Sequence, residues 1–269
     1  MLRRIFRAII KVLLDESSIT KFAIGAVLGL AFSLAVVLAT LGIMDGFELT
    51  LKQGLNRYEG DLQLYNRQGF FDVKEIMSWW AKTEVLSSPA VFSEGFVTVG
   101  ENSRGVQIRA IEAKTINGIL PGQLHLESGE VALGKELLAQ LRAKVGDEVV
   151  MIYGGDAGRS ITPTLERKKI IASVDHGIYQ KDLRVIYMNL REFQESTKME
   201  NRANILLLKF NQRADLAEKH PQVQKFLTSI EGEYFFYRTF WQEYSSLIQA
   251  VKVEKVMIGL ILQTMVVIA

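Results

Sequence analysis

The motif most suggestive of chemistry lies at residues 129–136, GEVALGKE, which match the glycine and lysine positions of a phosphate-binding loop. In such a loop, backbone amides cradle the phosphate and a Ser or Thr hydroxyl after the lysine holds Mg²⁺. Here Glu136 replaces that hydroxyl, and its carboxylate would repel phosphate. The sequence therefore predicts a strand and a turn that lead into a helix at residues 135–142, not a nucleotide site.

No other pattern in the sequence indicates catalysis or metal binding. His125, His176 and His220 lack metal-ligand spacing, so we expect each to be a surface or core residue. The absence of cysteine excludes disulfides and thiolate chemistry. Asp147 and Glu148 are adjacent, so on a strand they face opposite ways and cannot share a proton. We expect no catalytic residue, no metal ligand and no cofactor, and a protein that is not itself an enzyme.

The chain is organised around an apolar run at residues 22–44, which carries no charge between Lys21 and Asp45. A helix of this length measures about 34 Å, more than the roughly 30 Å of a hydrocarbon core. This run predicts a transmembrane helix, and it is far longer than the apolar part of a cleaved signal peptide. Cations precede it at Arg3, Arg4, Arg7, Lys11 and Lys21. The positive-inside rule therefore places the N-terminus in the cytoplasm and the residues after Asp45 outside.

Small residues recur at a spacing of four within this predicted span. Gly25, Gly29 and Ser33 share one helix face, which would let another helix approach closely. A span rich in small residues also produces this spacing by chance. Helix pairing and chance both stay open.

The predicted span has helical neighbours on both sides. Residues 2–14 form an amphipathic pattern typical of a helix at the membrane interface, so we assign residues 1–16 to it. Apolar positions beyond residue 45 continue at helical spacing, which predicts one span with a stalk over residues 17–58. Residues 256–269 are uncharged but measure only about 21 Å as a helix, too short to cross. We expect residues 241–269 to be a second stalk and the truncated start of a second span.

The segment between the spans, residues 59–240, predicts a large extracytoplasmic α/β domain. Its fold class is that of an α+β membrane protein, in which two split β-α-β units pack their helices on one face of a single sheet. These units comprise strands near 61–66, 91–99, 104–112, 204–210 and 233–238, with helices at 73–82 and 215–229. A mostly β subdomain is inserted at about 113–203, with strands at 130–133, 148–153, 165–174 and 184–188.

Three segments carry a resemblance to a known family: MDGFE at 44–48, GEVALGKELLAQLRAKVGDEVVMI at 129–152, and WQEYSSLIQAVKVEKVMIGLIL at 241–262. They resemble the LolC and LolE type of transmembrane permease subunit of the lipoprotein-releasing ABC transporters, within the wider MacB and FtsX-like permease group. The chain resembles the N-terminal part of such a permease.

This resemblance implies a multi-pass protein of the bacterial inner membrane with a large periplasmic domain. Its implied partners are a cytoplasmic ABC ATPase subunit, a second permease subunit that is identical or homologous, a periplasmic lipoprotein carrier, the lipoprotein substrate and membrane lipid, with no nucleic acid. ATP hydrolysis in the ATPase would move the periplasmic domains by mechanical transmission. The element that contacts the ATPase would lie beyond Ala269.

The resemblance also implies two binding regions. Apolar faces of the two spans would hold the lipoprotein, with Met44, Phe47, Met257 and Leu260 near the outer mouth. A loop within residues 154–167, GGDAGRSITPTLER, would grip the carrier through Thr162, Pro163 and Leu165. The same loop is also compatible with an ordinary polar hairpin, and both interpretations stay open.

Two other functions fit the same order of elements. One is a MacB-like efflux permease, and the other is an FtsX-like signalling permease that controls cell-wall hydrolases. The sequence does not distinguish a LolC from a LolE role, nor does it identify the lipoproteins.

Overall fold

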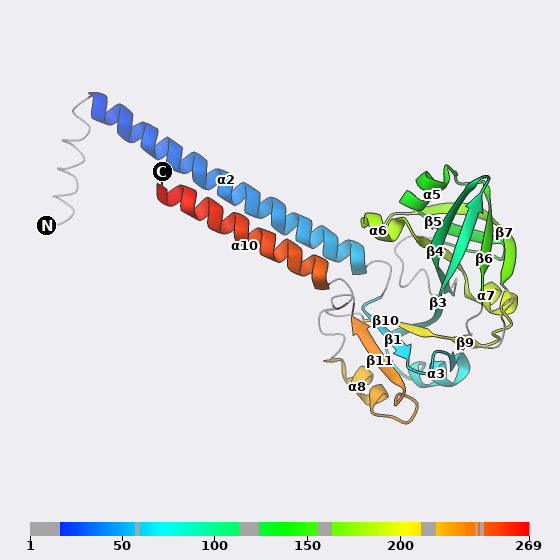
Figure 1. Ribbon diagram of the computed structural model, residues 1–269. Coiled ribbons are helices and arrows are strands. Elements are labelled where there is room, and N and C mark those ends of the chain that lie inside the picture. Colours follow the sequence, from blue (N-terminus) through cyan, green and yellow to red (C-terminus); the bar gives the residue numbers. More distant parts are fainter. Residues whose placement is uncertain are drawn as a thin grey trace. The chain divides into compact units, whose positions relative to one another are not determined.

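The computed structural model describes residues 17–56, 60–112, 124–154, 163–210, 219–239, 242 and 245–268. The chain divides into two compact units, one formed by Met1–Thr50 with Ser245–Ala269 and the other by Leu51–Tyr244 (Figure 1). The interfacial helix expected at residues 2–14 lies outside the described residues.

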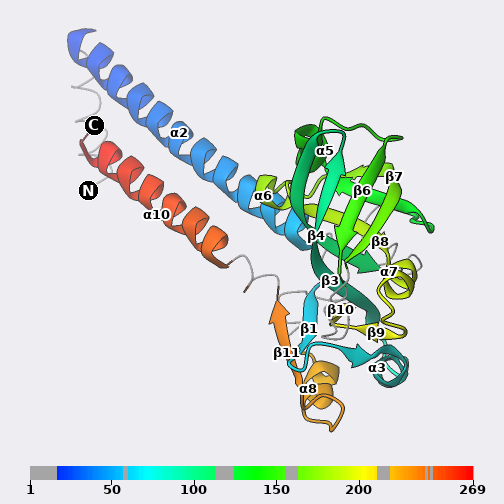
Figure 2. The same ribbon diagram turned by 45° about the vertical axis from the view of Figure 1, so that its right-hand side comes forward.

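The first unit is a pair of helices. α2 (Ser17–Asn56) is one unbroken helix of 40 residues, and α10 (Ser245–Ile268) runs beside it in the opposite direction (Figures 1 and 2). Among the described helices, only α2 is long and apolar enough to cross a membrane, over Thr20–Gly46. The helix that was predicted to continue past Asp45 is confirmed as far as Asn56. A second crossing at residues 241–269 stays a prediction.

The second unit contains a four-stranded antiparallel sheet in the order β11-β1-β10-β3. Its strands are β1 (Leu62–Asn66), β3 (Leu86–Val99), β10 (Ile205–Lys209) and β11 (Phe235–Thr239). α3 (Val73–Trp80) lies between β1 and β3 in the chain, and α8 (Pro221–Leu227) lies between β10 and β11. These are the two predicted split β-α-β units.

Both helices cover the same face of this sheet, as predicted. The rings of Trp79 and Trp80 on α3 lie 5.0 and 5.3 Å from the ring of Phe226 on α8, measured between centroids. Phe226 in turn contacts Phe235 on β11 at 5.2 Å. The apolar side chains of the two units therefore form one core. A small ladder of β2 (Phe71–Asp72) and β9 (Arg202–Ala203) lies outside this sheet.

The remaining strands close a barrel together with β3. The strands are β4 (Asn102–Ile111), β5 (Glu130–Gly134), β6 (Glu148–Tyr153), β7 (Thr164–Val174) and β8 (Val185–Asn189). Their order is β3-β4-β8-β5-β7-β6, and β6 pairs again with β3. The first residues of β3 pair with β10 and its last residues pair with β6. The strands before residue 113 and those of the predicted insert at about 113–203 are therefore hydrogen-bonded into one continuous sheet.

Three short helices pack on the barrel strands: α5 (Lys135–Leu141), α6 (Tyr179–Asp182) and α7 (Leu190–Ser196). The prediction for α5 is confirmed, whereas α6, α7, β2 and β9 were not predicted. These four elements have seven residues or fewer, so each is too short for a hydrophobic period to emerge.

Predicted boundaries differ from the observed ones at several elements, most of all at β3 and around α8. β3 begins at Leu86, five residues earlier than expected. The prediction placed the start later because Pro89 is unfavourable inside a strand, yet the strand includes it. The helix expected to end at residue 229 ends at Leu227. The chain folds back so tightly there that a Cβ on Gly232 would overlap the carbonyl oxygen of Phe226. The expected start of that helix, residues 215–218, lies outside the described residues.

The core contact between α3 and α8 yields a stability prediction. Phe226→Ala removes a fully buried ring, and we expect it to lower the free energy of unfolding by about 3–5 kcal/mol. Ile230→Ala, at an 87% exposed position three residues after α8, should change it by less than about 0.5 kcal/mol. Chemical denaturation followed by circular dichroism measures both. Equal effects of the two substitutions would contradict the proposed core.

Candidate functional site

An ion pair joins the two long helices. Lys255 of α10 pairs with Asp45, which ends the uncharged run of α2. Both side chains remain partly exposed to solvent. Because both charges remain exposed to solvent, the pair contributes little to stability. It marks one level at which α2 and α10 face each other.

Three of the four residues predicted to contact lipid lie close to this ion pair. Met44 is half-buried and adjacent to Asp45. Met257 and Leu260 are 57% and 58% exposed, and they lie about 3 and 7.5 Å along the helix axis from Lys255. Phe47 belongs to α2, but its side chain lies outside the described residues. The helix pair thus presents exposed apolar side chains beside this ion pair, while lipid binding by them stays a prediction.

The small-residue face of α2 is open within the described part of the chain. A Cβ built on Gly25 or Gly29 would have no neighbouring atom within 4 Å. Ser33, the third member of the face, is half-buried. No element of the described chain uses the close approach that this face permits. Pairing with another helix stays a prediction.

The predicted carrier loop is described only at its two ends. β6 ends at Tyr153, and β7 begins at Thr164. Pro163 is exposed and Leu165 is 66% exposed, whereas Thr162 lies outside the described residues. Leu165 pairs with Ile152 across the two strands. The structure therefore places the ends of the loop on a regular antiparallel pair.

A buried charged cluster lies directly beneath these loop ends. Lys168 on β7 forms ion pairs with Glu166 and with Glu192 of α7, the latter at 2.5 Å. Glu166 also accepts hydrogen bonds from Tyr153 and Ser196, both at 2.6 Å. The cluster ties β6, β7 and α7 together, so the two ends of the loop stand on a rigid base.

The pKa values of this cluster follow from burial and hydrogen bonding. Burial raises the pKa of the Glu166 carboxyl, but hydrogen bonds from Lys168, Ser196 and Tyr153 outweigh burial and hold it below its usual value. Burial, reinforced by the hydrogen bond to Glu166, raises the pKa of the Tyr153 hydroxyl above its ordinary value. At neutral pH the cluster therefore contains an ionised Glu166 and a neutral Tyr153.

A second buried polar group joins His176, Asp182 and Tyr187. The backbone N–H of His176 donates to Asp182, its Nδ1 contacts the same carboxylate, and its Nε2 lies 2.8 Å from the Tyr187 hydroxyl. Burial raises the pKa of Asp182 to about 6, although the His176 N–H opposes that rise. All three side chains are enclosed by the fold. The arrangement holds α6 against the barrel and is closed to a substrate.

The phosphate-loop lookalike has a structural role. Residues 130–134 are β5 and Lys135 begins α5, without a loop between them. The Lys135 amine donates to Asp175 at 3.1 Å, and this ion pair raises the pKa of Lys135. A Cβ on Gly134 would overlap the carbonyl oxygen of Asp182. Gly134 and Lys135 therefore pack α6 and its preceding turn against β5.

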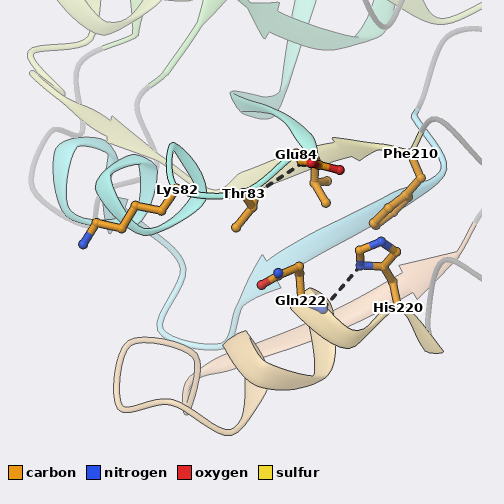
Figure 3. Close-up of a pocket in the computed structure, with 7 residues that line it drawn as sticks. Lys82, Thr83, Glu84, Phe210, His220 and Gln222 are labelled. Carbon is orange, nitrogen blue, oxygen red and sulfur yellow. Dashed lines mark hydrogen bonds between the residues drawn. The ribbon is translucent and has the colours of Figure 1, made fainter.

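The other two histidines lie at the surface and at a helix start. His125 is exposed, and His220 is the N-cap of α8, where its Nδ1 accepts from the Gln222 amide at 3.3 Å. Figure 3 shows the ring of His220 against that of Phe210, with centroids 4.7 Å apart, at a pocket of about 520 Å³. The opposite wall carries both a lysine and a glutamate, Lys82 and Glu84. Because these charges are mixed, the pocket favours no particular ligand.

Sequence reasoning missed the two charged contacts on which the candidate sites depend. Asp45 and Lys255 were each recognised as the end of an apolar run, but 210 positions separate them in the chain. The sequence did hold a clue to the burial of Lys168. Lys168 and Ile170 are two residues apart on β7, so they share a face, and Ile170 is fully buried. A lysine on a buried face requires carboxylate partners.

No protein-family model matches the chain. The lipoprotein-releasing system transmembrane protein LolC of Xylella fastidiosa (strain 9a5c) is 20% identical over 91% of this chain and 61% of its own length. That match confirms the resemblance to the LolC type. The chain therefore spans less than two thirds of this curated relative.

Two solved structures are also similar. The periplasmic region of MacB from Actinobacillus actinomycetemcomitans is 15% identical with a TM-score of 0.46, over 72% of this chain and 94% of its own. The extracellular domain of the noncanonic ABC-type transporter YknZ from Gram-positive bacteria is 11% identical with a TM-score of 0.44, over 66% and 99%.

Removal of the buried lysine should be costly. Lys168→Met leaves the buried Glu192 and the half-buried Glu166 without their cation, and we expect it to lower the free energy of unfolding by about 3–5 kcal/mol. Lys169→Met, at the exposed neighbouring position, should change it by less than about 0.5 kcal/mol. Urea denaturation of both variants measures the difference. A Lys168→Met protein as stable as the Lys169→Met control would show that the cluster does not hold the loop base.

The inter-helix ion pair can be tested by charge exchange. Since the chain has no cysteine, spin labels on Ile43→Cys and Val256→Cys, both exposed, report the distance between the helices. Lys255→Glu should lengthen and broaden that distance through repulsion from Asp45, as measured by double electron–electron resonance. Adding Asp45→Lys should restore the original distribution. Failure of this exchange to restore the distance would argue against the pairing.

Proposed function

We propose that this chain is a permease subunit of an ABC transporter that extracts outer-membrane lipoproteins from the inner membrane and passes them to a periplasmic carrier. The observation that carries this proposal is the match to LolC over 91% of the chain. The structure adds support, because an apolar helix of membrane-spanning length is paired with α10 beside exposed apolar side chains.

Several partners follow from this proposal. ATP is hydrolysed by a separate cytoplasmic ATPase subunit, and a second permease, identical or homologous, completes the transmembrane part. The open Gly25 and Gly29 face of α2 is suited to contact that second permease. The chain lies in the inner membrane as a multi-pass protein, with its N-terminus in the cytoplasm and the Leu51–Tyr244 unit in the periplasm.

The connectivity offers a route for mechanical transmission. α2 leads through Gly60 into β1, and β11 leads within a few residues into α10. Leu62 at the start of β1 pairs with Thr239 at the end of β11. The two long helices therefore connect to the same end of one pair of neighbouring strands. In this proposal, movement of the helices reaches the sheet through the short connections to β1 and β11.

The two binding regions take complementary roles in this scheme. Met44, Phe47, Met257 and Leu260 form the outer mouth of the lipid site, and Leu260 and Met257 supply its exposed apolar surface. The loop that contains Thr162, Pro163 and Leu165 contacts the carrier. Its rigid base on Lys168 and Glu192 keeps that contact fixed relative to the barrel.

Photo-crosslinking tests the proposed lipid site. A photoreactive amino acid at Met257 or Leu260 in inner membranes should capture an acylated lipoprotein, because the exposed apolar surface there would face its acyl chains. The same amino acid at Ile230, which is more exposed but lies in the other unit, should capture none. Mass spectrometry of the adducts identifies the captured protein. Lipoprotein adducts at Ile230 as abundant as those at Met257 would contradict the site.

Depletion of the chain separates this function from its two alternatives. Accumulation of outer-membrane lipoproteins in the inner membrane supports lipoprotein release. Normal lipoprotein sorting overturns it. Copurification of a periplasmic adaptor and a duct protein would then indicate efflux, and a cell-wall hydrolase would indicate signalling.

A further inference from the structure

The chain enters the four-stranded sheet through Gly60 and Asp61, which precede β1. Gly60 has a positive φ of 74°, and a Cβ built on it would lie 2.7 Å from the carbonyl oxygen of Leu208 on β10. The backbone N–H of Asp61 donates to that same oxygen at 2.8 Å. Glycine is the residue that combines such a φ with so close an approach. The chain is therefore held against β10 before β1 begins.

The side chain of Asp61 adds two contacts with the end of β10. Asp61 is 1% exposed, and its Oδ2 accepts from the N–H of Phe210 at 2.7 Å. Its Oδ1 lies 3.7 Å from the Nζ of Lys209. A buried carboxylate is costly unless it is paired and hydrogen-bonded, and both conditions are met here. Asp61 thus fastens the entering chain to the strand on the far side of β1 from β11.

The chain leaves the sheet at Thr239, the last residue of β11. The Thr239 N–H donates to the side-chain oxygen of Gln242 at 3.2 Å, and the Gln242 N–H donates to the Thr239 hydroxyl oxygen at 3.3 Å. Reciprocal bonds between a Thr and a Gln three residues later form a capping box, the arrangement that starts a helix. Thr239 also pairs with Leu62 of β1 and is 4% exposed. One buried residue therefore belongs both to the sheet and to a capping box.

The entry and the exit lie at the same end of the sheet. Leu62, the first residue of β1, pairs with Leu208 on one side and with Thr239 on the other. Asp61 directly precedes Leu62, and Figure 2 shows β1 and β11 side by side. The segments that connect the sheet to α2 and to α10 are therefore both fastened by side chains at one row across three strands.

We propose that Asp61 and Thr239 are the residues through which the sheet follows the two long helices during transport. The inference rests on the proposed function, in which a separate ATPase drives the chain. The contacts of Asp61 fasten the segment that comes from α2, and the capping box fastens the segment that leads to α10. A displacement of either segment is then passed to β1, β10 and β11 and is not absorbed at the junctions. Because both residues act through the sheet, they are positioning residues.

Hydrogen exchange in the complex with the ATPase and the second permease tests this role. Mass spectrometry follows peptides that cover β1, β10 and β11, before and after the ATPase is trapped with ATP and vanadate. We expect trapping to change the exchange of these peptides in the wild-type complex. Thr239→Val removes the hydroxyl acceptor and should reduce that change at least about threefold, whereas Thr239→Ser should retain it. Thr197→Val removes another buried hydroxyl, which donates to the Phe193 carbonyl, and should retain the change.

The entry is tested in the same way. Asp61→Ala should reduce the exchange change at least about threefold, because the Phe210 N–H loses its charged acceptor. Asp72→Ala is the control: this carboxylate also accepts backbone N–H groups, from Lys74 and Glu75, but it belongs to the start of α3. Transfer of lipoprotein to the carrier per ATP hydrolysed, measured in parallel, should fall with the exchange change.

A failure of this inference is distinguishable from a failure of the proposed function. A wild-type complex that shows the exchange change but transfers no lipoprotein would contradict lipoprotein release and support the coupling role. A wild-type complex without the change, or variants at Asp61 and Thr239 that behave like their controls, would overturn the coupling role.

A variant outside the core separates coupling from loss of fold. Gln242 is exposed, so Gln242→Leu breaks the capping box without disturbing a buried side chain and should leave thermal unfolding of the sheet unit unchanged. It should still reduce the exchange change, and adding Thr239→Val should reduce it no further, because the two residues form one reciprocal pair. Full retention of the change in Gln242→Leu would overturn the role of the exit.

Discussion

Backbone pairing along β3 is the interaction on which the extracytoplasmic unit depends. This strand of 14 residues pairs with β10 at its start, with β4 over most of its length and with β6 near its end. It is therefore at once the edge of a four-stranded sheet and a member of a closed six-stranded barrel. A change in its register would turn Val91 and Val97, both buried, toward the opposite face. The sheet and the barrel are therefore both fixed by this one strand.

Local patterns predicted the elements better than their pairing. The sequence pattern alone predicted the long apolar helix α2, the strands β1 and β6, and the helix α5. Periodicity does not predict the closure of the barrel, because β3 and β6 are about 55 residues apart and neither strand's sequence indicates which strand it pairs with. Pro89 disguised the start of β3, and the tight return at Gly232 shortened α8. The predicted fold class is confirmed, whereas the continuity between sheet and barrel was not foreseen.

The same limit applies to the candidate sites. Met44, Met257 and Leu260 were predicted from a family resemblance, and the structure places Met44 and Met257 beside a shared ion pair. The partners of Lys168 could not be predicted, since Glu192 lies on a helix that the sequence did not indicate. The stacking of Arg238 on Tyr65 was missed for a related reason. Arg238 and Tyr65 become neighbours only through the pairing of β1 with β11, which are distant in the chain.

The adjacency of β1 and β11 has a mechanical consequence. A force that separates the end of α2 from the start of α10 would load this strand pair at one end, at Leu62 and Thr239. Hydrogen bonds loaded in this zipper-like geometry carry the force one at a time, and each contributes only about 0.5–1.5 kcal/mol net. The buried Asp61, which accepts from the Phe210 N–H at 2.7 Å, reinforces the opposite side of β1 at that same end. If the two connections were pulled apart, the hydrogen bonds between β1 and β11 would therefore break first at the Leu62 and Thr239 end.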